Sequence, residues 1–283
     1  MKKIKVIYLL GCARSGSTVL GIILGNIKGL FYPGELFAWN KYKGVPHNQK
    51  KETREFWEKV LKNSRELKPF FKYDFFDLME SYYSFRNFLK WGDQKLWKDY
   101  CDSNTALFRR LAQISRAHAI VDSSHYALRA FWLSKEPRID LNLIYLVREP
   151  VSVMNAFLKQ DIEQRSKNPV TGNIYYGMVN FLCTMVYLFF TKGKKIKVRY
   201  EDMINEPEVT ISRITRELGI KQRIHGFNDM EVGHLFEANR IKNEFKIDLE
   251  RKNKDIKINP LWRFVIKLIQ LPFYLIFGYQ IMK

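Results

Sequence analysis

An apolar stretch near the N-terminus, followed at once by a loop of small residues, most strongly limits the fold of this chain. The residues from Ile4 to Leu10 are apolar and β-branched apart from Lys5, as in a strand buried on both faces of a parallel sheet. The loop from Gly11 to Thr18 reads G-C-A-R-S-G-S-T, and an apolar helical pattern resumes at 19–24. A strand, a glycine-bearing loop and a helix in this order predict a site that holds a phosphate or sulfate group.

Three later segments extend this pattern along the chain. Short apolar runs at 119–121, 141–147 and 195–200 end in polar residues, and the first two are followed by helical patterns. Repeated strand-then-helix order implies parallel strands joined by right-handed crossovers. We therefore predict an α/β fold with a P-loop-like parallel sheet flanked by helices, built as one domain of residues 1–283.

Two segments fall outside this pattern. Residues 41–116 alternate lysines, aromatic and acidic residues with helical spacing, and predict a helical insertion that lies over the carboxyl ends of the strands and covers the active site. Residues 261–282 are apolar, but two cations, a glutamine and a proline interrupt them and argue against a membrane-spanning helix. We expect a closing helix on the core. A helix resting on acidic lipid is the alternative, because Arg263 and Lys267 lie one turn apart.

Charge and cysteine content narrow the class of partner and the compartment. A net charge of +19 favours a polyanion, whether nucleic acid, anionic lipid, acidic glycan or a phosphorylated cosubstrate. Three cysteines without paired or metal-like spacing argue against a disulfide framework and a zinc site. The short apolar run after the first lysines is typical of a core strand rather than a secretory signal. We expect a reducing, cytoplasmic location and no metal.

The details of the loop separate it from the nucleotide triphosphatases. Its spacing matches G-x-x-x-x-G-K-[ST], but Ser17 replaces the lysine and Arg14 is the one cation. The loop resembles the 5'-phosphosulfate loop of the sulfotransferases, whose carbohydrate and bacterial branches read R-S-G-S-[ST]. This resemblance implies 3'-phosphoadenosine 5'-phosphosulfate (PAPS) as the cosubstrate, held by Arg14, Ser15, Gly16, Ser17 and Thr18.

A second segment, L-V-R-E-P at 146–150, resembles the family segment in which an arginine grips the 3'-phosphate of the nucleotide. Here that residue is Arg148, and its planar fork of donors suits a phosphate. The family expects a serine eight residues later, where this chain has Ala156. Ser152 and Asn155 are nearby donors, and we assign Ser152 to this role.

Three further segments resemble the family in the expected order. V-D-S-S-H at 121–125 places His125 where lysine is usual, and the resemblance implies that this side chain steadies the bridging oxygen of the departing nucleotide. A capping or core histidine is the alternative interpretation. Y-E-D begins at Tyr200, and the loop A-N-R-I-K supplies Asn239 and Lys242 to close over the 3'-phosphate, with lysine in place of the family's arginine.

Glu35, in P-G-E-L at 33–36, is our candidate for the general base that accepts the acceptor's proton. The family often carries a G-E pair after the loop helix, and burial can raise the pKa of a carboxyl toward a useful value. A salt bridge to lysine is the alternative role for Glu35, and His125 is the alternative base. Arg14 and His125 complete the predicted catalytic set.

The acceptor is predicted from the aromatic residues of the insertion and its surroundings, which alternate with lysines and could stack on sugars. They are Trp39, Tyr42, Trp57, Tyr82, Tyr83 and Trp91. The alternative is that they form the insertion's own core. We expect a carbohydrate or glycolipid acceptor, an acidic or membrane-linked glycan among them, no specific nucleic acid, and peripheral contact with an anionic membrane.

The sequence therefore predicts a sulfotransferase that moves the sulfuryl group of PAPS to a hydroxyl or amine. A P-loop kinase is the alternative enzyme, because 11–18 keeps the glycine spacing and 119–122 could end at a magnesium-binding aspartate. A catalytically degenerate, basic nucleotide- or lipid-binding protein is the third hypothesis, motivated by Ala156, His125 and the positive charge.

Overall fold

The fold is centred on a parallel sheet of five strands, in the order β2-β3-β1-β4-β5. The computed structural model describes residues 3–47, 50–62, 64–67, 69–158, 168–221, 224, 226–237, 240–249 and 258–280. The strands are β1 Ile4–Gly11, β2 Leu30–Phe31, β3 Ala119–His125, β4 Ile139–Val147 and β5 Lys195–Arg199. Every pairing within this sheet is parallel, so the predicted α/β fold is confirmed.

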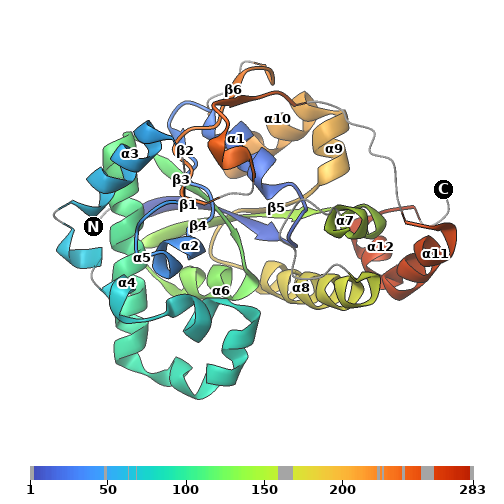
Figure 1. Ribbon diagram of the computed structural model, residues 1–283, viewed down its shortest axis with the longest axis horizontal. Coiled ribbons are helices and arrows are strands. Elements are labelled where there is room, and N and C mark those ends of the chain that lie inside the picture. The colour runs from blue at the N-terminus through green and yellow to red at the C-terminus, as the bar shows by residue number, and fades with distance from the viewer. Residues whose placement is uncertain are drawn as a thin grey trace.

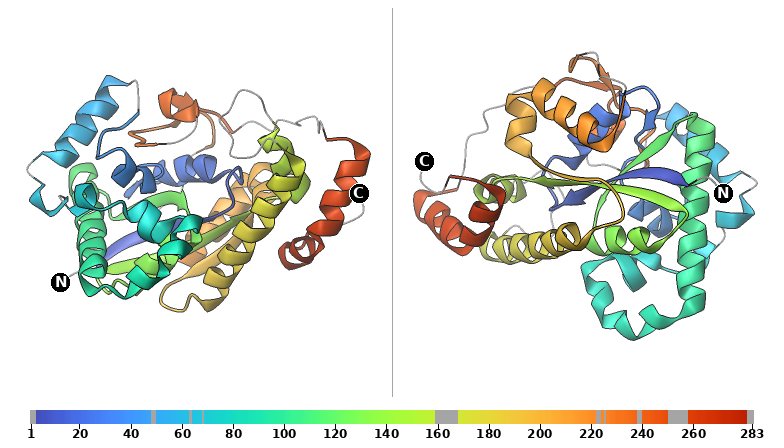
Figure 2. Two further views of the ribbon diagram at one scale, coloured as in Figure 1. Left: turned by 60° about the horizontal axis from the view of Figure 1, so that its bottom comes forward. Right: turned by 180° about the vertical axis from the view of Figure 1, so that it is seen from behind.

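Two layers of helices cover the sheet, as Figures 1 and 2 show. On one face lie α1 Ser17–Gly25, α9 Tyr200–Asn205 and α10 Pro207–Leu218. On the other lie α5 Gln94–Ser115, α6 Ala127–Lys135 and α8 Pro169–Phe189. Successive side chains of a strand point to opposite faces. Accordingly, Ile7 and Leu9 join the core beneath α1 and α10, while Val6 and Tyr8 join the core beneath α5, α6 and α8.

The strand order makes the carboxyl end of β1 a topological switch point. The chain leaves β1 through α1 on one face to reach β2, and it later passes from β3 to β4 through α6 on the other face. Connections that depart to opposite faces beside a central strand open a crevice at its carboxyl end, where α/β proteins bind ligands. The predicted anion loop follows β1 directly and therefore lies at this point.

The strand bounds differ from the prediction in two informative places. β3 was expected at 119–121 but extends to His125, because the polar side chains of Asp122, Ser123 and Ser124 are fully buried and hydrogen-bonded. β2 was not expected, since an edge strand of two residues gives no periodic signal.

The insertion consists of short helices and one long helix. They are α2 Phe37–Lys41, α3 Lys51–Leu61, η1 Arg65–Leu67, α4 Pro69–Lys72, η2 Phe76–Glu80, η3 Tyr82–Gly92 and α5. α5 packs on a face of the sheet. Phe37 of α2 and Phe76 of η2 each lie 5.0 Å from the Tyr126 ring, just past the end of β3. These two elements bring the insertion to the carboxyl edge, and its role as an acceptor cap stays a prediction.

The C-terminal part contains a short hairpin and two helices rather than one. The elements are β6 Met230–Glu231, η4 Arg240–Asn243, β7 Lys246–Ile247, α11 Pro260–Ile269 and α12 Leu271–Phe277. The axis bends by 70° between α11 and α12, next to Pro272. Ile266, Tyr274 and Phe277 are buried, so the predicted closing contact with the core is present. Across the described ranges, no single helix is long and apolar enough to cross a membrane.

Candidate nucleotide-binding and active site

Four strand ends bring the predicted site residues to one edge of the sheet. In the strand register, Leu10 pairs with His125, Gly11 with Leu146, and Val147 with Arg199. The loop after β1, His125 on β3, Arg148 after β4 and Tyr200 after β5 consequently lie side by side. Residues that are far apart in the sequence thus form one site.

The loop after β1 is folded by its own backbone. Both the amide and the hydroxyl of Ser15 donate to the carbonyl of Cys12, at 3.2 and 2.6 Å. Arg14 and Gly16 have positive φ angles of 68° and 94°. α1 then begins at Ser17, so its first amides and its positive end face the loop. The hydroxyl of Ser15 is therefore committed to the loop, while the α1 amides stay suited to an anion.

Gly16 is required by the ring that packs against the loop. A Cβ atom added to Gly16 would lie 2.4 Å from Cδ2 of Tyr200, and its φ of +94° also disfavours any side chain. Tyr200 is the first residue of α9 and the start of the predicted Y-E-D segment. This tyrosine thus packs against the loop and supports it, through a contact with Gly16 that the sequence did not reveal.

Arg148 lies between the loop and Tyr200. Its Nη1 atom donates to the carbonyl oxygen of Arg14 at 2.8 Å, and its guanidinium stacks 4.2 Å from the centre of the Tyr200 ring. The carbonyl of Arg148 accepts from the Tyr176 hydroxyl at 2.8 Å. The Nε atom of Arg148 is buried and has no hydrogen-bond partner within the described residues. An anionic ligand at this place would satisfy that donor.

α7, Pro150–Phe157, continues the chain after Arg148 and carries the predicted Ser152. Its N-cap is Glu149, whose carboxylate accepts from the Ser152 amide at 2.7 Å. Ser152 is half-buried in the first turn of α7, and Ala156 lies one turn further along the helix. Ser152 is therefore close to Arg148, whereas the position where the family has a serine offers only a methyl group.

Two tyrosines of the C-terminal segment fix the helix starts beside Arg148 and Tyr200. The Tyr274 hydroxyl donates to the carboxylate of Glu149, and the Tyr279 hydroxyl donates to that of Glu201 at 2.7 Å. The amide of Glu149 donates to Glu201 at 3.1 Å. Burial raises the pKa of Glu201 despite these bonds. No local sequence pattern indicated this bracing, because its partners are distant in the chain.

Glu35 lies on the opposite side of β1 from Arg148, near the end of β3. The amide of Ser123 donates to the Gly34 carbonyl at 3.3 Å, and the Glu35 amide donates to the Glu237 carbonyl at 2.9 Å. Gly34 has a φ of +86°, and a Cβ there would meet the Glu237 oxygen at 2.4 Å. Glu35 is half-buried and its position is fixed by backbone bonds on both sides.

Thr18, Tyr32 and Ser123 connect the loop helix to the end of β3. The hydroxyls of Tyr32 and Ser123 lie 2.8 Å apart, and the side chain of Thr18 lies close enough to Tyr32 to act on the pKa of its hydroxyl. Burial raises the pKa of Tyr32, and the negative charge of the nearby Glu35 raises it further. Glu35 is thus within electrostatic reach of the loop helix.

His125 ends β3 in a left-handed conformation, with a φ of 55°. Its ring is stacked on Tyr126 at 4.8 Å and meets the edge of Phe37 at 6.2 Å. Its Nδ1 atom lies 3.3 Å from the Ser123 carbonyl, and the residue is 8% exposed. A strained residue held by packing at a strand end is typical of functional sites. The structure places His125 beside the loop but does not test its catalytic role.

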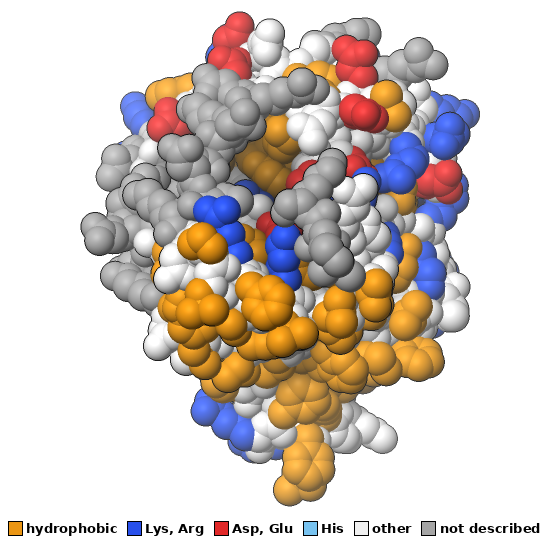
Figure 3. All heavy atoms as spheres, turned by 90° about the vertical axis from the view of Figure 1, so that its right-hand side faces the viewer, with side chains coloured by type: hydrophobic (Ala, Val, Ile, Leu, Met, Phe, Trp, Pro, Cys, Tyr) orange, Lys and Arg blue, Asp and Glu red, His pale blue; other side chains and the backbone are white. Residues whose placement is uncertain are grey.

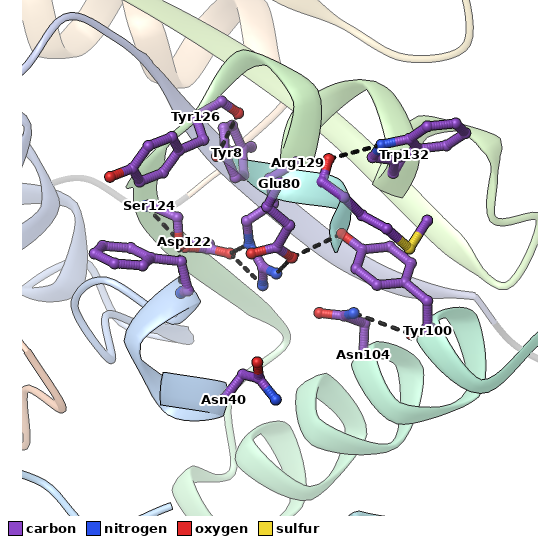
Figure 4. A network of polar contacts seen from close by, with 12 residues as sticks. Tyr8, Asn40, Glu80, Tyr100, Asn104, Asp122, Ser124, Tyr126, Arg129 and Trp132 are labelled. Carbon is purple, nitrogen blue, oxygen red and sulfur yellow. Dashed lines mark hydrogen bonds and ion pairs between the residues drawn. The ribbon is translucent and has the colours of Figure 1, made fainter. Parts of the chain in front are cut away.

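A buried ion network behind His125 was missed by the sequence analysis (Figure 4). Arg129 of α6 pairs with Glu80 of η2 and donates from Nε to Asp122 of β3 at 3.0 Å. The Tyr100 hydroxyl donates to Glu80 at 2.8 Å. Asp122 also accepts from the amide of Ser124 at 2.9 Å. The network therefore ties the insertion to the strand that carries His125. Its sequence signal is an arginine inside the otherwise apolar run A-L-R-A-F-W-L.

The side chains of two predicted nucleotide ligands are not described. Asn239 is not among the described residues, and for Lys242 only the backbone, within η4, is described. The preceding residues are informative, because the Phe236 amide donates to the Pro33 carbonyl at 2.7 Å. The chain therefore reaches the Glu35 side of the site immediately before Asn239. No group of three or more metal-binding side chains is found among the described residues.

The fold and the site define a P-loop-like α/β protein with a glycine-bearing loop and an arginine that faces it. A sequence model described as the sulfotransferase family matches residues 7–223. The chain therefore belongs to the sulfotransferase family. A search among curated proteins found no match.

Solved sulfotransferase structures share this fold. The sulfotransferase domain from the curacin biosynthetic pathway is 16% identical with a TM-score of 0.58, over 99% of both chains. The sulfotransferase domain from the Synechococcus PCC 7002 olefin synthase is 17% identical with a TM-score of 0.55, over 99% of this chain and 97% of that one. A Mycobacterium avium sulfotransferase is 10% identical with a TM-score of 0.51, over 99% and 78%. At these identities the likeness shows the fold alone.

Proposed function

We propose that this chain transfers the sulfuryl group of PAPS to a hydroxyl or amine of a carbohydrate or glycolipid. The single observation that supports this most strongly is the contact of Arg148 with the Arg14 carbonyl at 2.8 Å. A nucleotide whose 5'-phosphosulfate meets the loop would present its 3'-phosphate within the same small region. One cosubstrate can therefore contact both arginines.

The residues present suit a ligand with two separate anionic groups. The α1 amides, with the side chains of Ser17 and Thr18, suit the phosphosulfate end, where Gly16 allows close approach of the backbone. The buried Nε of Arg148 suits the 3'-phosphate. Ser152 adds a donor beside Arg148 at the start of α7. The Ser15 side chain has a different role from those of Ser17 and Thr18, because its hydroxyl already donates to the Cys12 carbonyl and so supports the loop itself.

The proposed reaction is an in-line displacement at sulfur. The acceptor oxygen or nitrogen forms a bond to sulfur, while the bond from sulfur to the bridging oxygen breaks and adenosine 3',5'-bisphosphate leaves. Glu35 takes the proton that the acceptor loses, and Arg14 and the loop amides stabilise charge on the sulfuryl and leaving oxygens. His125 lies at the neighbouring strand end and donates to the bridging oxygen as it gains charge.

The burial of several aromatic side chains changes the predicted acceptor-binding surface. Trp39 and Trp57 are 0% exposed and Tyr82 is 8% exposed, so for these three the alternative interpretation, the insertion's own core, is correct. A residue without exposed surface cannot stack on a sugar. Tyr83 is 64% exposed, and Tyr42 and Trp91 are half-buried. These three, with the net charge of +19, support an acidic carbohydrate or glycolipid acceptor.

Ligand titration tests the cosubstrate. We expect adenosine 3',5'-bisphosphate to bind in calorimetry and magnesium ATP to bind far more weakly, because Ser17 stands where a kinase needs lysine. Tight binding of magnesium ATP alone would favour the kinase alternative and overturn this proposal.

Transfer of label tests the reaction itself. Incubating the protein with radiolabelled PAPS and fractionated cell extract, followed by identification of the labelled product, names the acceptor. Firm nucleotide binding without any labelled product in any fraction would favour the degenerate-protein hypothesis, which the methyl group of Ala156 already motivates.

A further inference from the structure

Three helices leave a broad apolar surface on one side of the molecule. We define the α8–α12 face by the exposed apolar residues of α8, α11 and α12, which Figure 3 shows gathered on one side. Each is between 45% and 75% exposed. They are Val170, Ile174, Met178, Phe181, Leu188, Phe189, Leu261, Phe264, Leu268, Ile269, Leu275 and Ile276. A surface of this extent on a folded protein marks an interaction site.

α8 is apolar on both of its sides. Its exposed stripe includes Ile174, Met178 and Phe181, spaced as one helical face, and its buried stripe includes Tyr176 and Val179. α8 is 21 residues long and contains no charged residue. The outward side of a helix on a water-exposed surface is normally polar, so the outward stripe of α8 needs an apolar environment.

α11 and α12 are attached firmly, with their remaining apolar side chains outward. At their junction, Gln270 donates to the backbone and side-chain oxygens of Asn173 on α8, both at 3.0 Å. The carbonyl of Gly278 accepts from Arg199 at 3.0 Å, and Ile276 accepts from Lys197 at 2.6 Å. With the bonds of Tyr274 and Tyr279 described above, these contacts fix both helices on the protein. The two helices, with a bend of 70° between them, are thus held along the surface of the protein.

The three helices of this face and the segment that follows α8 carry cations and no acids of their own. The stretches 168–200 and 258–280 contain no aspartate or glutamate. Their cations are Lys192, Lys194, Lys195, Lys197, Arg199, Arg263 and Lys267. Lys195 and Lys197 donate to carbonyls at the C-terminal ends of α8 and α12, so cations border the apolar residues. Apolar helices bordered by cations are typical of proteins that rest on anionic lipid.

A second copy of the chain fits this face less well. A two-fold symmetric interface would place the same surface patch on both subunits. Cations would then face cations across the interface, with no acid from these two stretches to pair them. An anionic lipid surface complements both the apolar residues and the charge.

We propose that the α8–α12 face docks on an anionic membrane surface, with α11 and α12 in the plane of the headgroups. The docking proposal does not depend on the proposed function. The conclusion drawn from the docking about the acceptor does rest on the proposed function. Tyr274 of α12 bonds Glu149, and Tyr279, two residues past the end of α12, bonds Glu201, next to Arg148 and Tyr200. The docked face therefore adjoins the site, which favours an acceptor attached to membrane lipid.

Vesicle flotation tests the docking. We expect the full chain to float with vesicles of equimolar phosphatidylcholine and phosphatidylglycerol, and much less with phosphatidylcholine alone. The variant Phe264→Ser with Leu268→Ser changes two side chains that are 65% and 62% exposed, so it should fold normally. Its vesicle affinity should fall by about tenfold per side chain. Val209→Ser, 65% exposed on α10, is the matched control and should float like the wild type.

Several outcomes would overturn the docking proposal. Failure of the wild-type chain to float with anionic vesicles would do so, as would equal flotation of the double variant and the wild type. Sedimentation without lipid that showed a dimer, dissociated by the double variant, would assign the face to a second copy. Binding of adenosine 3',5'-bisphosphate is measured in parallel, because its loss in the wild type would refute the proposed function while leaving the docking result intact.

Discussion

The guanidinium of Arg148 donates a hydrogen bond to the backbone carbonyl of Arg14, although 134 positions separate the two residues in the sequence. This bond joins the loop after β1 to the end of β4, two strands that are neighbours in the sheet. It uses one nitrogen of the arginine and leaves its buried Nε without a partner in the described part of the chain. Arg148 is thus positioned by the loop while one of its buried donors stays available for the proposed nucleotide.

Replacing Arg148 by lysine should separate the contribution of charge to nucleotide affinity from the contribution of side-chain geometry. Lysine keeps the positive charge but loses the planar fork, so it cannot bond the Arg14 carbonyl and bind a phosphate with the same geometry. We expect affinity for adenosine 3',5'-bisphosphate to fall by about 10- to 100-fold in Arg148→Lys, and further in Arg148→Ala. Calorimetry checks this, with Arg216→Ala, an exposed arginine of α10, as the control. Unchanged affinity in both Arg148 variants would remove Arg148 from the nucleotide site.

Gly16→Ala should damage the loop and the nucleotide site together. The new Cβ would collide with the Tyr200 ring at 2.4 Å and would occupy a backbone with a φ of +94°. The strained conformation alone costs about 1–3 kcal/mol in the free energy of unfolding. Urea denaturation and nucleotide titration measure the two effects. Gly92→Ala is the control, because a Cβ there meets nothing within 4 Å. Equal stability of the two variants would show that the loop can rearrange around Tyr200.

Arg129→Met should be among the most destabilising single changes in the described part of the chain. It leaves the carboxylates of Glu80 and Asp122 buried without their shared cation, at 2% and 0% exposure. Removing one partner from a buried ion pair costs about 3–5 kcal/mol. Arg138→Met, in an ion pair at the start of β4 whose arginine is 35% exposed, should cost much less. If the two variants unfold at similar urea concentrations, the network is not essential for holding the insertion.

The contribution of Glu201 to stability should fall with rising pH. Burial raises the pKa of this carboxyl in the folded state above the unfolded value of about 4.3. Between the two values the folded state binds the proton more tightly, so the free energy of unfolding decreases as pH rises. Glu201→Gln should flatten this dependence. Denaturation curves at several pH values for both proteins test it, and parallel pH dependences would exclude Glu201 as the source.

The sequence predicted the parts of the fold that are encoded locally. β1, the loop and α1 follow one another directly, so their apolar runs and glycines were sufficient to predict this strand, loop and helix. The order of later strands then indicated the parallel sheet. The bend at Pro272 carried a local signal as well, but the surrounding apolar residues were interpreted as one continuous helix.

The sequence did not predict the contacts that position the site residues. The bonds from Tyr274 to Glu149 and from Tyr279 to Glu201 span 125 and 78 positions, and the pair of Arg129 with Glu80 spans 49. Contacts between distant segments leave no periodic pattern in a single sequence. Trp39 and Trp57 show the same limit, since their spacing fitted both an acceptor surface and a core until burial distinguished the two.

Glu35 and His125 are the two candidates for the base, and their variants should separate them. Glu35→Gln should lower the rate of labelled transfer by about 10²- to 10⁴-fold, as loss of a general base does, while nucleotide affinity stays unchanged. The fold should tolerate it, because backbone bonds from Glu35 to Glu237 and from Ser123 to Gly34 hold this segment in place. Glu208→Gln, exposed in the first turn of α10, is the control. Full activity in Glu35→Gln would exclude Glu35 as the base and leave His125 as the candidate, whereas loss of activity in His125→Gln alone fits either a base or the donor to the bridging oxygen.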